Sequence, residues 1–210
     1  PTSLMGAMVL IRQVYHDAKW YAKGGADRMD LALEAFNKNK NLPQIFEANS
    51  MANALRAHKI AKEFGVRYIL KGGGDEFERI NAIKATNSPF IIPVDFPDAY
   101  DVSDPVNASI LDLKDMRYWN QAPSNPKILA DQGVEFAFTT DGVKKLKDFT
   151  ANIRKAIARG LSETKALEAL TTVPAKLLGM GDHIGSLKNG RQANFFICSG
   201  SPFEEASVLY

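Results

Sequence analysis

Four short apolar runs alternate with helical patterns along the chain. The runs are strand-sized and apolar at most positions, and they lie at residues 44–48, 66–71, 90–94 and 134–140. Segments with apolar residues at helical spacing follow each of them. Strands that are apolar on both faces are typical of parallel sheets covered by helices. The pattern therefore predicts an α/β fold in which a parallel strand is followed by helical structure four times.

The expected helices carry recognisable start and stop signals. Ser50 precedes a stripe of small and aromatic residues, and Gly65 ends that stripe, so a helix is predicted between them. Thr2 or Ser3 is expected to cap a helix that Gly24 and Gly25 break. Further helices are predicted at residues 29–38, 75–84, 113–119, 125–132, 146–157 and after Ser162.

Composition restricts the classes of protein to consider. The chain has 210 residues, 45% hydrophobic and 24% charged, with a formal net charge of +2. This length suits one sizeable domain, and no basic run suggests a nucleic-acid partner. Apolar runs are far shorter than the roughly 20 residues of a membrane span. Cys198 alone cannot form an internal disulfide, which is compatible with a cytoplasmic location without establishing one.

The stretch from Arg67 to Phe77, "RYILKGGGDEF", raises the question of a phosphate-binding loop. The lysine precedes the glycines, and no Gly-Lys-Ser/Thr follows them. Asp75 and Glu76 would repel a phosphate at the start of the next helix, where acidic residues are favoured without any ligand. The three glycines are instead expected to let the chain turn tightly at the mouth of a pocket.

Periodicity alone leaves the architecture open between an open doubly wound sheet and part of a (β/α)8 barrel. The segment "ALTTVPAKLLGMGDHIGSLKNGRQANFFICSGSPFE" resembles the C-terminal signature of the amidohydrolase superfamily, most closely its imidazolonepropionase-like branch. "PTSLMGAMVLIRQVYHDAKWY" resembles a helix after an earlier barrel strand of that branch. "FEAN", "ILKGGGDE" and "FTTDG" resemble its fifth, sixth and eighth strand ends.

The resemblance implies a partial (β/α)8 TIM barrel of amidohydrolase type, with about four βα units and a C-terminal strand segment. Residues 1–180 would form the C-terminal half of the barrel. Residues 181–210 would be a tail with a strand at 193–198, belonging to the family's small β-sandwich. The first residue is Pro1, and either methionine removal or a longer parent chain would explain this start.

The resemblance also places candidate site residues at strand ends, where the loops of a barrel build the pocket. The metal-binding, proton-transferring aspartate of the last strand aligns with Asp141, which would otherwise cap a helix or turn the chain. The fifth-strand histidine aligns with Glu47, either a metal ligand or a carboxylate paired with a cation. The sixth-strand histidine aligns with Lys71, whose ammonium would neutralise Glu47 or Asp141 rather than bind metal. Gly72 and Gly73 follow Lys71 in the expected pocket.

A catalytic metal is implied by the family, zinc or another divalent ion, with a metal-bound water as the nucleophile. Catalytic zinc usually needs three protein ligands, and Glu47 with Asp141 supplies two. The family's His-x-His pair is absent from this sequence, and His16, His58 and His183 lie outside the matching positions. The sequence therefore predicts weak metal binding, or none, for this chain alone.

Two classes of function remain open. The first is a hydrolase of carbon–nitrogen bonds, non-peptide or cyclic amide, acting on a small molecule and competent when the earlier strands are supplied. The second is a barrel-derived structural or binding module without catalysis. In both cases exposed sheet edges predict a partner, either an N-terminal barrel half or another copy in a homo-oligomer.

Overall fold

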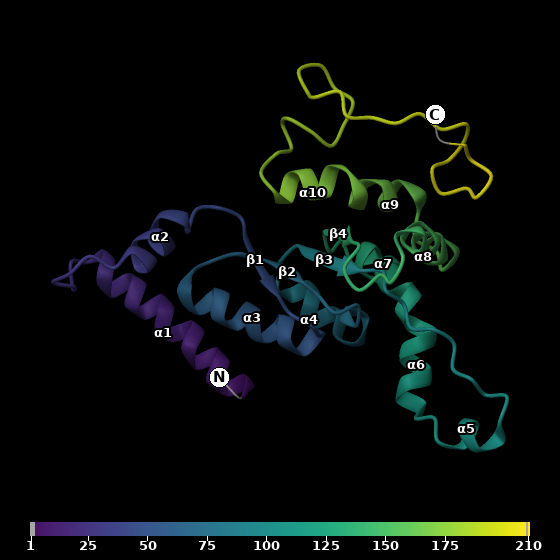
Figure 1. Cartoon of the computed structure of the whole chain (residues 1–210), viewed down its shortest axis with the longest axis horizontal. Coiled ribbons are helices and arrows are strands. Elements are labelled where there is room, and N and C mark those ends of the chain that lie inside the picture. Colours follow the sequence, from purple (N-terminus) through teal and green to yellow (C-terminus); the bar gives the residue numbers. More distant parts are fainter. Residues whose placement is uncertain (1–2, 209) are drawn as a thin grey trace.

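The fold is centred on a sheet of four parallel strands. The computed structural model describes residues 3–208 and residue 210. The strands follow one another in chain order across the sheet, and they are β1 (Gln44–Glu47), β2 (Tyr68–Lys71), β3 (Phe90–Pro93) and β4 (Phe136–Thr139) (Figure 1). All three pairings are parallel, so the four carboxyl ends lie at one edge of the sheet. The predicted α/β class with four parallel strands is confirmed.

Helices connect and cover the strands. The α-helices are α1 (Leu4–Ala22), α2 (Leu31–Asn39), α3 (Met51–Phe64), α4 (Ile80–Ala85), α5 (Pro105–Ser109), α6 (Leu113–Gln121), α7 (Asn125–Asp131), α8 (Leu146–Ala158), α9 (Glu163–Leu170) and α10 (Thr172–Leu177). Two short 3₁₀ helices are η1 (Glu76–Arg79) and η2 (Ala122–Ser124). Within the described residues, no helix is both long enough and apolar enough to cross a membrane.

Helix α3 begins and ends where its sequence signals predict. The Ser50 hydroxyl accepts a hydrogen bond from the Asn53 amide at 3.4 Å. Gly65 ends the helix in the left-handed conformation, with φ of 69°, which glycine adopts without steric cost. Ser3 likewise caps α1 by accepting from the Gly6 amide, whereas Thr2 lies outside the described residues.

The core lies between the sheet and its covering helices. Leu70, Phe90 and Ile92 from the central strands are fully buried, together with Leu129 of α7 and Ile153 of α8. Along each strand, the side chains that alternate with these buried strand residues face the other side of the sheet. On that side Ile45 of β1 is 51% exposed. One side of the sheet is therefore covered by helices, and the other is partly open at β1.

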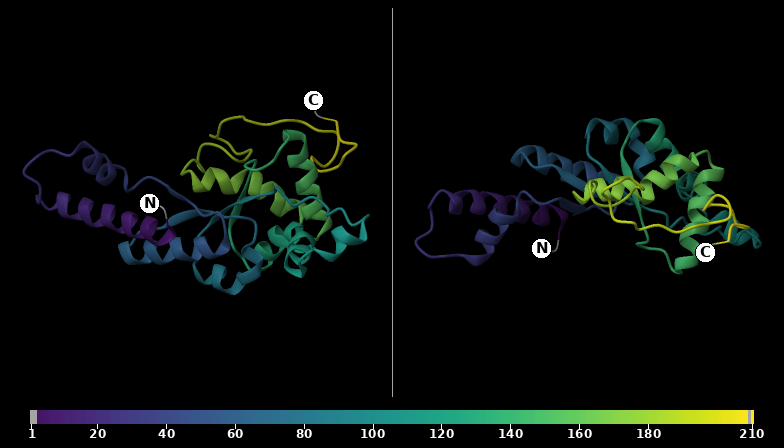
Figure 2. Two further views of the ribbon diagram at one scale, coloured as in Figure 1. Left: turned by 60° about the horizontal axis from the view of Figure 1, so that its bottom comes forward. Right: turned by 90° about the horizontal axis from the view of Figure 1, so that it is seen from above.

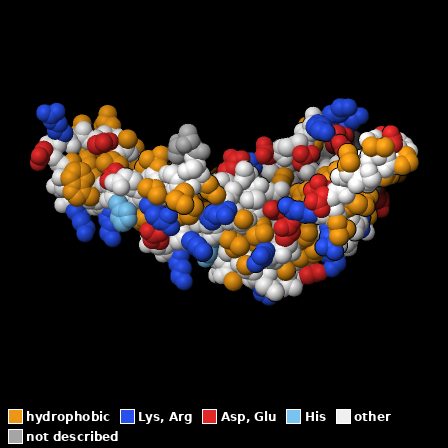
Figure 3. All heavy atoms as spheres, turned by 90° about the horizontal axis from the view of Figure 1, so that it is seen from below, with side chains coloured by type: hydrophobic (Ala, Val, Ile, Leu, Met, Phe, Trp, Pro, Cys, Tyr) orange, Lys and Arg blue, Asp and Glu red, His pale blue; other side chains and the backbone are white. Residues whose placement is uncertain are grey.

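Helices α1 and α2 form a hairpin at one end of the molecule (Figures 1 and 2). The Tyr15 hydroxyl lies 2.6 Å from the hydroxyl of Tyr68 on β2, and the Tyr15 ring stacks on Phe64. Only Ala18 of α1 is fully buried, and Leu4 at the start of the helix is 50% exposed. The apolar stripe of α1 is thus only partly covered, and Figure 3 shows apolar side chains on this part of the surface.

A second projection follows β3. The chain leaves the sheet after Pro93, forms α5 and α6, and returns through η2 to α7; we call residues 97–121 the arm (Figure 1). Apolar side chains exposed on the arm are Tyr100, Val102, Val106, Ile110, Leu113, Met116 and Trp119. The arm lies at the carboxyl end of β3, on the side of the sheet where loops shape a site.

Two expectations about secondary structure are wrong. The segment 75–84 is not one helix, because η1 precedes α4 and Glu76 turns inward. Within the described residues, the tail at 193–198 forms no strand and has only an isolated bridge at Cys198. A strand needs a neighbour for its backbone groups, and the tail instead bonds to itself, with the Ser199 amide donating to the Val208 carbonyl at 3.0 Å.

Candidate functional site

Charged side chains gather at the carboxyl edge of the sheet. Glu47 and Lys71 are the last residues of β1 and β2 and are register partners. Asp95 and Asp141 each follow the end of their strand by two residues, after β3 and β4. Each strand thus brings one charged residue to the same edge, and we call these four residues the strand-end cluster.

Lys71 joins two carboxylates of the strand-end cluster. Its ammonium nitrogen donates to Oε1 of Glu47 at 2.8 Å and lies 2.6 Å from Oδ2 of Asp141. To reach Asp141 the side chain spans the end of β3, because β2 and β4 are not neighbours in the sheet. The Lys71 side chain is 20% exposed, against 72% for Glu47 and 62% for Asp141.

The proximity of opposite charges changes the acidity of this trio. The hydrogen bond to Asp141, and then the one to Glu47, raises the pKa of Lys71 above its usual range. The same ammonium lowers the pKa of Asp141. The lysine therefore stays protonated and Asp141 stays ionised over the whole neutral range.

Asp95 is the member of the strand-end cluster that the sequence reasoning missed. A Cβ placed on Gly142 would lie 3.0 Å from Oδ2 of Asp95, so this carboxylate packs against the turn that follows Asp141. Asp95 also lines a hollow of about 260 Å³ that reaches Lys155 on α8. Its position directly after a strand is the signal that could have found it, because site residues of a barrel lie at the carboxyl ends of its strands, whereas Glu47 and Asp141 were selected by the family resemblance.

The three glycines form a tight turn directly after Lys71. A Cβ on Gly72 would collide with Oε1 of Glu76, and one on Gly73 would lie 2.5 Å from the carbonyl oxygen of Asn49. Gly74 has φ of +88°. Close packing on two sides and a left-handed residue explain why the turn consists of glycines.

The acidic pair after the glycines does not cap its own helix. Oδ1 of Asp75 accepts from the Met51 amide at the start of α3, at 2.6 Å. Glu76 is fully buried, and burial raises the pKa of its carboxyl. Asp75 therefore bonds to the start of α3 and Glu76 lies in the core.

Tyr118 of α6 covers the glycine turn from the arm. Its ring stacks on Phe77 at 6.2 Å between centroids, and its hydroxyl would lie 3.7 Å from a Cβ on Gly74. Burial, followed by the nearby charge of Asp75, raises the pKa of this phenol. The arm thus contributes Tyr118 beside the glycine turn, and its Asp98 lines the hollow that Asp95 also lines.

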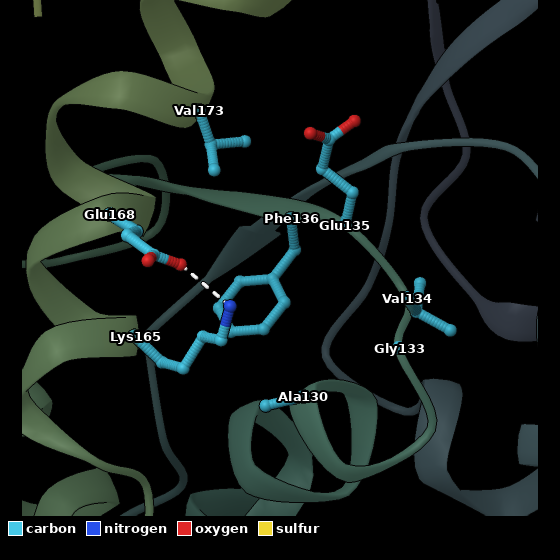
Figure 4. Close-up of a pocket in the computed structure, with 8 residues that line it drawn as sticks. All are labelled: Ala130, Gly133, Val134, Glu135, Phe136, Lys165, Glu168 and Val173. Carbon is cyan, nitrogen blue, oxygen red and sulfur yellow. Dashed lines mark hydrogen bonds and ion pairs between the residues drawn. The ribbon is translucent and has the colours of Figure 1, made fainter.

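A separate pocket lies at the opposite end of the sheet. It is lined by Ala130, Gly133, Val134, Glu135, Phe136, Lys165, Glu168 and Val173, and it surrounds the beginning of β4 (Figure 4). Lys165 and Glu168 within it form an ion pair at 2.7 Å. Because parallel strands present site loops at their carboxyl ends, this pocket is not part of the strand-end cluster.

Comparison with known proteins gives the family. The sequence model of the Amidohydrolase family matches residues 38–208. The chain belongs to the amidohydrolase family. Amidohydrolase TasK of Hapsidospora irregularis is 27% identical over 214 residues, which cover 96% of this chain and 22% of TasK.

Solved amidohydrolases share the fold. An amidohydrolase from Thermotoga maritima MSB8 superposes with a TM-score of 0.77 and 25% identity, covering 100% of this chain and 54% of that one. A prolidase complexed with N-methylphosphonate-L-proline superposes with a TM-score of 0.55 and 19% identity, over 83% of this chain and 42% of that one. The chain thus spans about half the length of the Thermotoga amidohydrolase and about a fifth of TasK.

Amidohydrolases typically bind divalent metal ions, and the residues of the strand-end cluster do not fit one. Oε1 of Glu47 and Oδ2 of Asp141 already accept from the Lys71 ammonium, which carries no lone pair for a metal. Across residues 3–208, no group of three His, Cys, Asp or Glu side chains is arranged to hold a metal ion. The cation between the two carboxylates is a lysine.

Proposed function

We propose that the protein is an amidohydrolase-type hydrolase of carbon–nitrogen bonds, in non-peptide or cyclic amides, of the imidazolonepropionase-like branch. In this proposal the chain supplies the later strands of a (β/α)8 barrel. The observation that supports it is the ion trio of Lys71 with Glu47 and Asp141 at the carboxyl edge of the sheet. Membership of the amidohydrolase family supports the reaction class.

Asp141 is the group we propose for proton transfer. The last strand delivers it to the carboxyl edge, and its 62% exposed side chain can reach a bound small molecule. Its lowered pKa keeps it ionised, so it can accept a proton, although a depressed pKa also makes it a weak base. Lys71 would hold Asp141 in position and offset the charge of Glu47.

The proposed partner is an N-terminal barrel half, or another copy of the chain. Strands β1 and β4 are the outermost strands of the sheet, and each pairs with one neighbouring strand within it. Backbone groups on such edges favour pairing with further strands. The exposed Ile45 on the uncovered side of β1 supports the same idea.

Light scattering tests the proposed partner. We expect the isolated chain to assemble beyond a monomer, and to become monodisperse when joined to the missing strands. A monomeric mass together with no binding of an apolar-surface dye would count against an unpaired sheet.

The second candidate is a non-catalytic module derived from the barrel. It is supported by the same ion trio, because one oxygen of each carboxylate is paired with an ammonium in place of a metal. In this case Lys71 is a structural replacement for a cation, and no substrate is turned over.

Hydrolysis assays separate these two candidates. We would measure metal content and turnover of esters, lactams and dipeptides for this chain, and for the same chain joined to a complete N-terminal half. Asp141→Asn removes the proposed proton-transfer group. Asp131→Asn is the matched control, because Asp131 is also paired with a lysine but lies on α7.

The two outcomes are distinct. Turnover that appears in the joined form, is lost in Asp141→Asn and persists in Asp131→Asn supports the hydrolase. No turnover in either form, with normally folded protein, favours the non-catalytic module.

A further inference from the structure

Two buried polar side chains lie directly beneath the glycine turn. Glu76 is 0% exposed and Asn125 at the start of α7 is 1% exposed. Oε2 of Glu76 accepts from Nδ2 of Asn125 at 2.6 Å. Oε1 of Glu76 accepts from the Gly74 amide at 3.1 Å, and Oδ1 of Asn125 accepts from the Phe77 amide at 2.9 Å.

This buried pair is costly for a core and is fully satisfied. Burying a carboxylate without a cation is unfavourable, and among the described residues no lysine or arginine pairs with Glu76. The hydrogen bonds join η1, α7 and the glycine turn. Glu76 and Asn125 themselves are 49 residues apart in the sequence. Fully satisfied polar networks of this kind make a site rigid.

The turn fixed by this pair directly follows Lys71. The Gly72 amide donates to the Ile91 carbonyl at 2.9 Å, and the Glu76 carboxylate fills the space where a Gly72 side chain would lie. The Lys71 carbonyl accepts from the Ala48 amide at 2.8 Å. A shift of the turn therefore moves the backbone that sets the direction of the Lys71 side chain.

We propose that Glu76 and Asn125 are positioning residues, which hold the Gly72–Gly74 turn so that the Lys71 ammonium lies between Glu47 and Asp141. They act through the turn and touch neither carboxylate of the trio. The inference rests on the proposed function only in taking Lys71 as the centre of the site. Its test needs no substrate, so an inactive chain does not affect it.

The hydrogen-bond pattern allows a swap experiment in the full chain. Glu76→Gln turns an amide toward the Asn125 amide, so two donors face each other. Asn125→Asp turns a carboxylate toward the Glu76 carboxylate, so two acceptors face each other. The double variant E76Q/N125D restores one donor and one acceptor and can make every original bond. Glu78→Gln is the control, because Glu78 lies on the same η1 and is exposed.

Two NMR readouts report on positioning. One is the titration of the Lys71 side chain, assigned by its loss in Lys71→Met. The other is hydrogen exchange at the Gly72 and Gly74 amides, which donate to the Ile91 carbonyl and to Oε1 of Glu76. We expect each single variant to lower the pKa of Lys71 and to speed exchange about tenfold or more. Both readouts should return toward wild type in E76Q/N125D and stay unchanged in Glu78→Gln.

The opposite result would overturn the proposal. If both single variants lower the melting temperature but leave the Lys71 titration and the glycine exchange as in wild type, the pair is only part of the core. If a single variant does not fold, E76M/N125L replaces both partners by apolar groups of similar size. A wild-type Lys71 titration in that folded variant would equally exclude a positioning role, whereas a lowered pKa would support it.

Discussion

Gly73 lies against the backbone of Asn49, so closely that a Cβ on Gly73 would be 2.5 Å from the Asn49 carbonyl oxygen. This contact brings the turn after β2 onto the turn after β1. A backbone atom cannot swing aside as a long side chain can. The distance between the two strand ends is therefore set by the absence of a side chain at Gly73.

Replacing Gly73 by alanine should destabilise the protein. We expect Gly73→Ala to lower the free energy of unfolding by about 1–3 kcal/mol, the usual cost of an overpacked contact. Gly181→Ala is the control, because a Cβ there would lie 3.5 Å from its nearest neighbour. Urea unfolding measures both variants, and equal losses would contradict the predicted contact.

The Lys71–Asp141 pair should stabilise the fold over a defined pH range. The pKa of Asp141 is lowered from its ordinary 3.8, so its contribution is present above that value and is lost as the pH falls through the lower, folded-state pKa. The pKa of Lys71 is raised from its ordinary 10.5, so its contribution is complete below that value and is lost as the pH rises through the higher, folded-state pKa.

The difference in unfolding free energy between wild type and Asp141→Asn should therefore be constant between about pH 5 and pH 9 and shrink outside that range. Because Asp141 is exposed, added salt should reduce the difference. A difference that grows as the pH falls below this range would contradict the ion pair.

Asn152 of α8 should stabilise the end of β3. It is 8% exposed, and its Nδ2 donates to the Val94 carbonyl at 2.8 Å. Asn152→Ala removes one of the two donors to that carbonyl and leaves the Phe96 amide at 3.0 Å as the other, at an expected cost of about 1 kcal/mol. Asn53→Ala, which removes exposed side-chain bonds to Asn49 at 2.7 Å and from Arg56 at 2.8 Å, should change stability by less than about 0.5 kcal/mol. Thermal unfolding compares the two, and similar changes would rule out a special role for Asn152.

The α1–α2 hairpin should depend on the tyrosine pair. Tyr68 is 5% exposed, and burial followed by the hydrogen bond to Tyr15 raises the pKa of its phenol. Tyr15→Phe removes the partner of a buried hydroxyl and should cost about 1–3 kcal/mol. Tyr21→Phe is the control, since its hydroxyl accepts only an exposed bond from the Asp30 amide. Limited proteolysis should cut the hairpin of Tyr15→Phe first; wild-type resistance would contradict the prediction.

Much of the fold could be predicted because its signals are local. Ser50 and Gly65 bound α3 by hydrogen bonding and backbone conformation within a few residues, and the structure confirms both ends. The continuous apolar runs indicated parallel strands because a buried strand has no polar face. The prediction of a strand at 193–198 in the tail was wrong, because an apolar extended segment becomes a strand only beside a partner strand. No local sequence pattern shows whether such a partner is present.

The site could be predicted only in part. Glu47, Lys71 and Asp141 came from the resemblance to strand ends, and the structure places all three at one edge of the sheet. The burial of Glu76 could not be predicted, because it depends on Asn125, which is distant in sequence. The local signal at that position was only that acidic residues are favoured at a helix start, which says nothing of burial.

The two projections determine what fluorescence can report. Trp20 belongs to the α1–α2 hairpin and Trp119 to the arm, and they are 54% and 39% exposed. These are the two tryptophans of the chain, so its emission follows the periphery and not the sheet. A denaturation curve recorded by tryptophan emission should accordingly precede one recorded by circular dichroism. A change in emission at low denaturant, before the circular dichroism changes, would mark detachment of the projections while the parallel sheet is still intact.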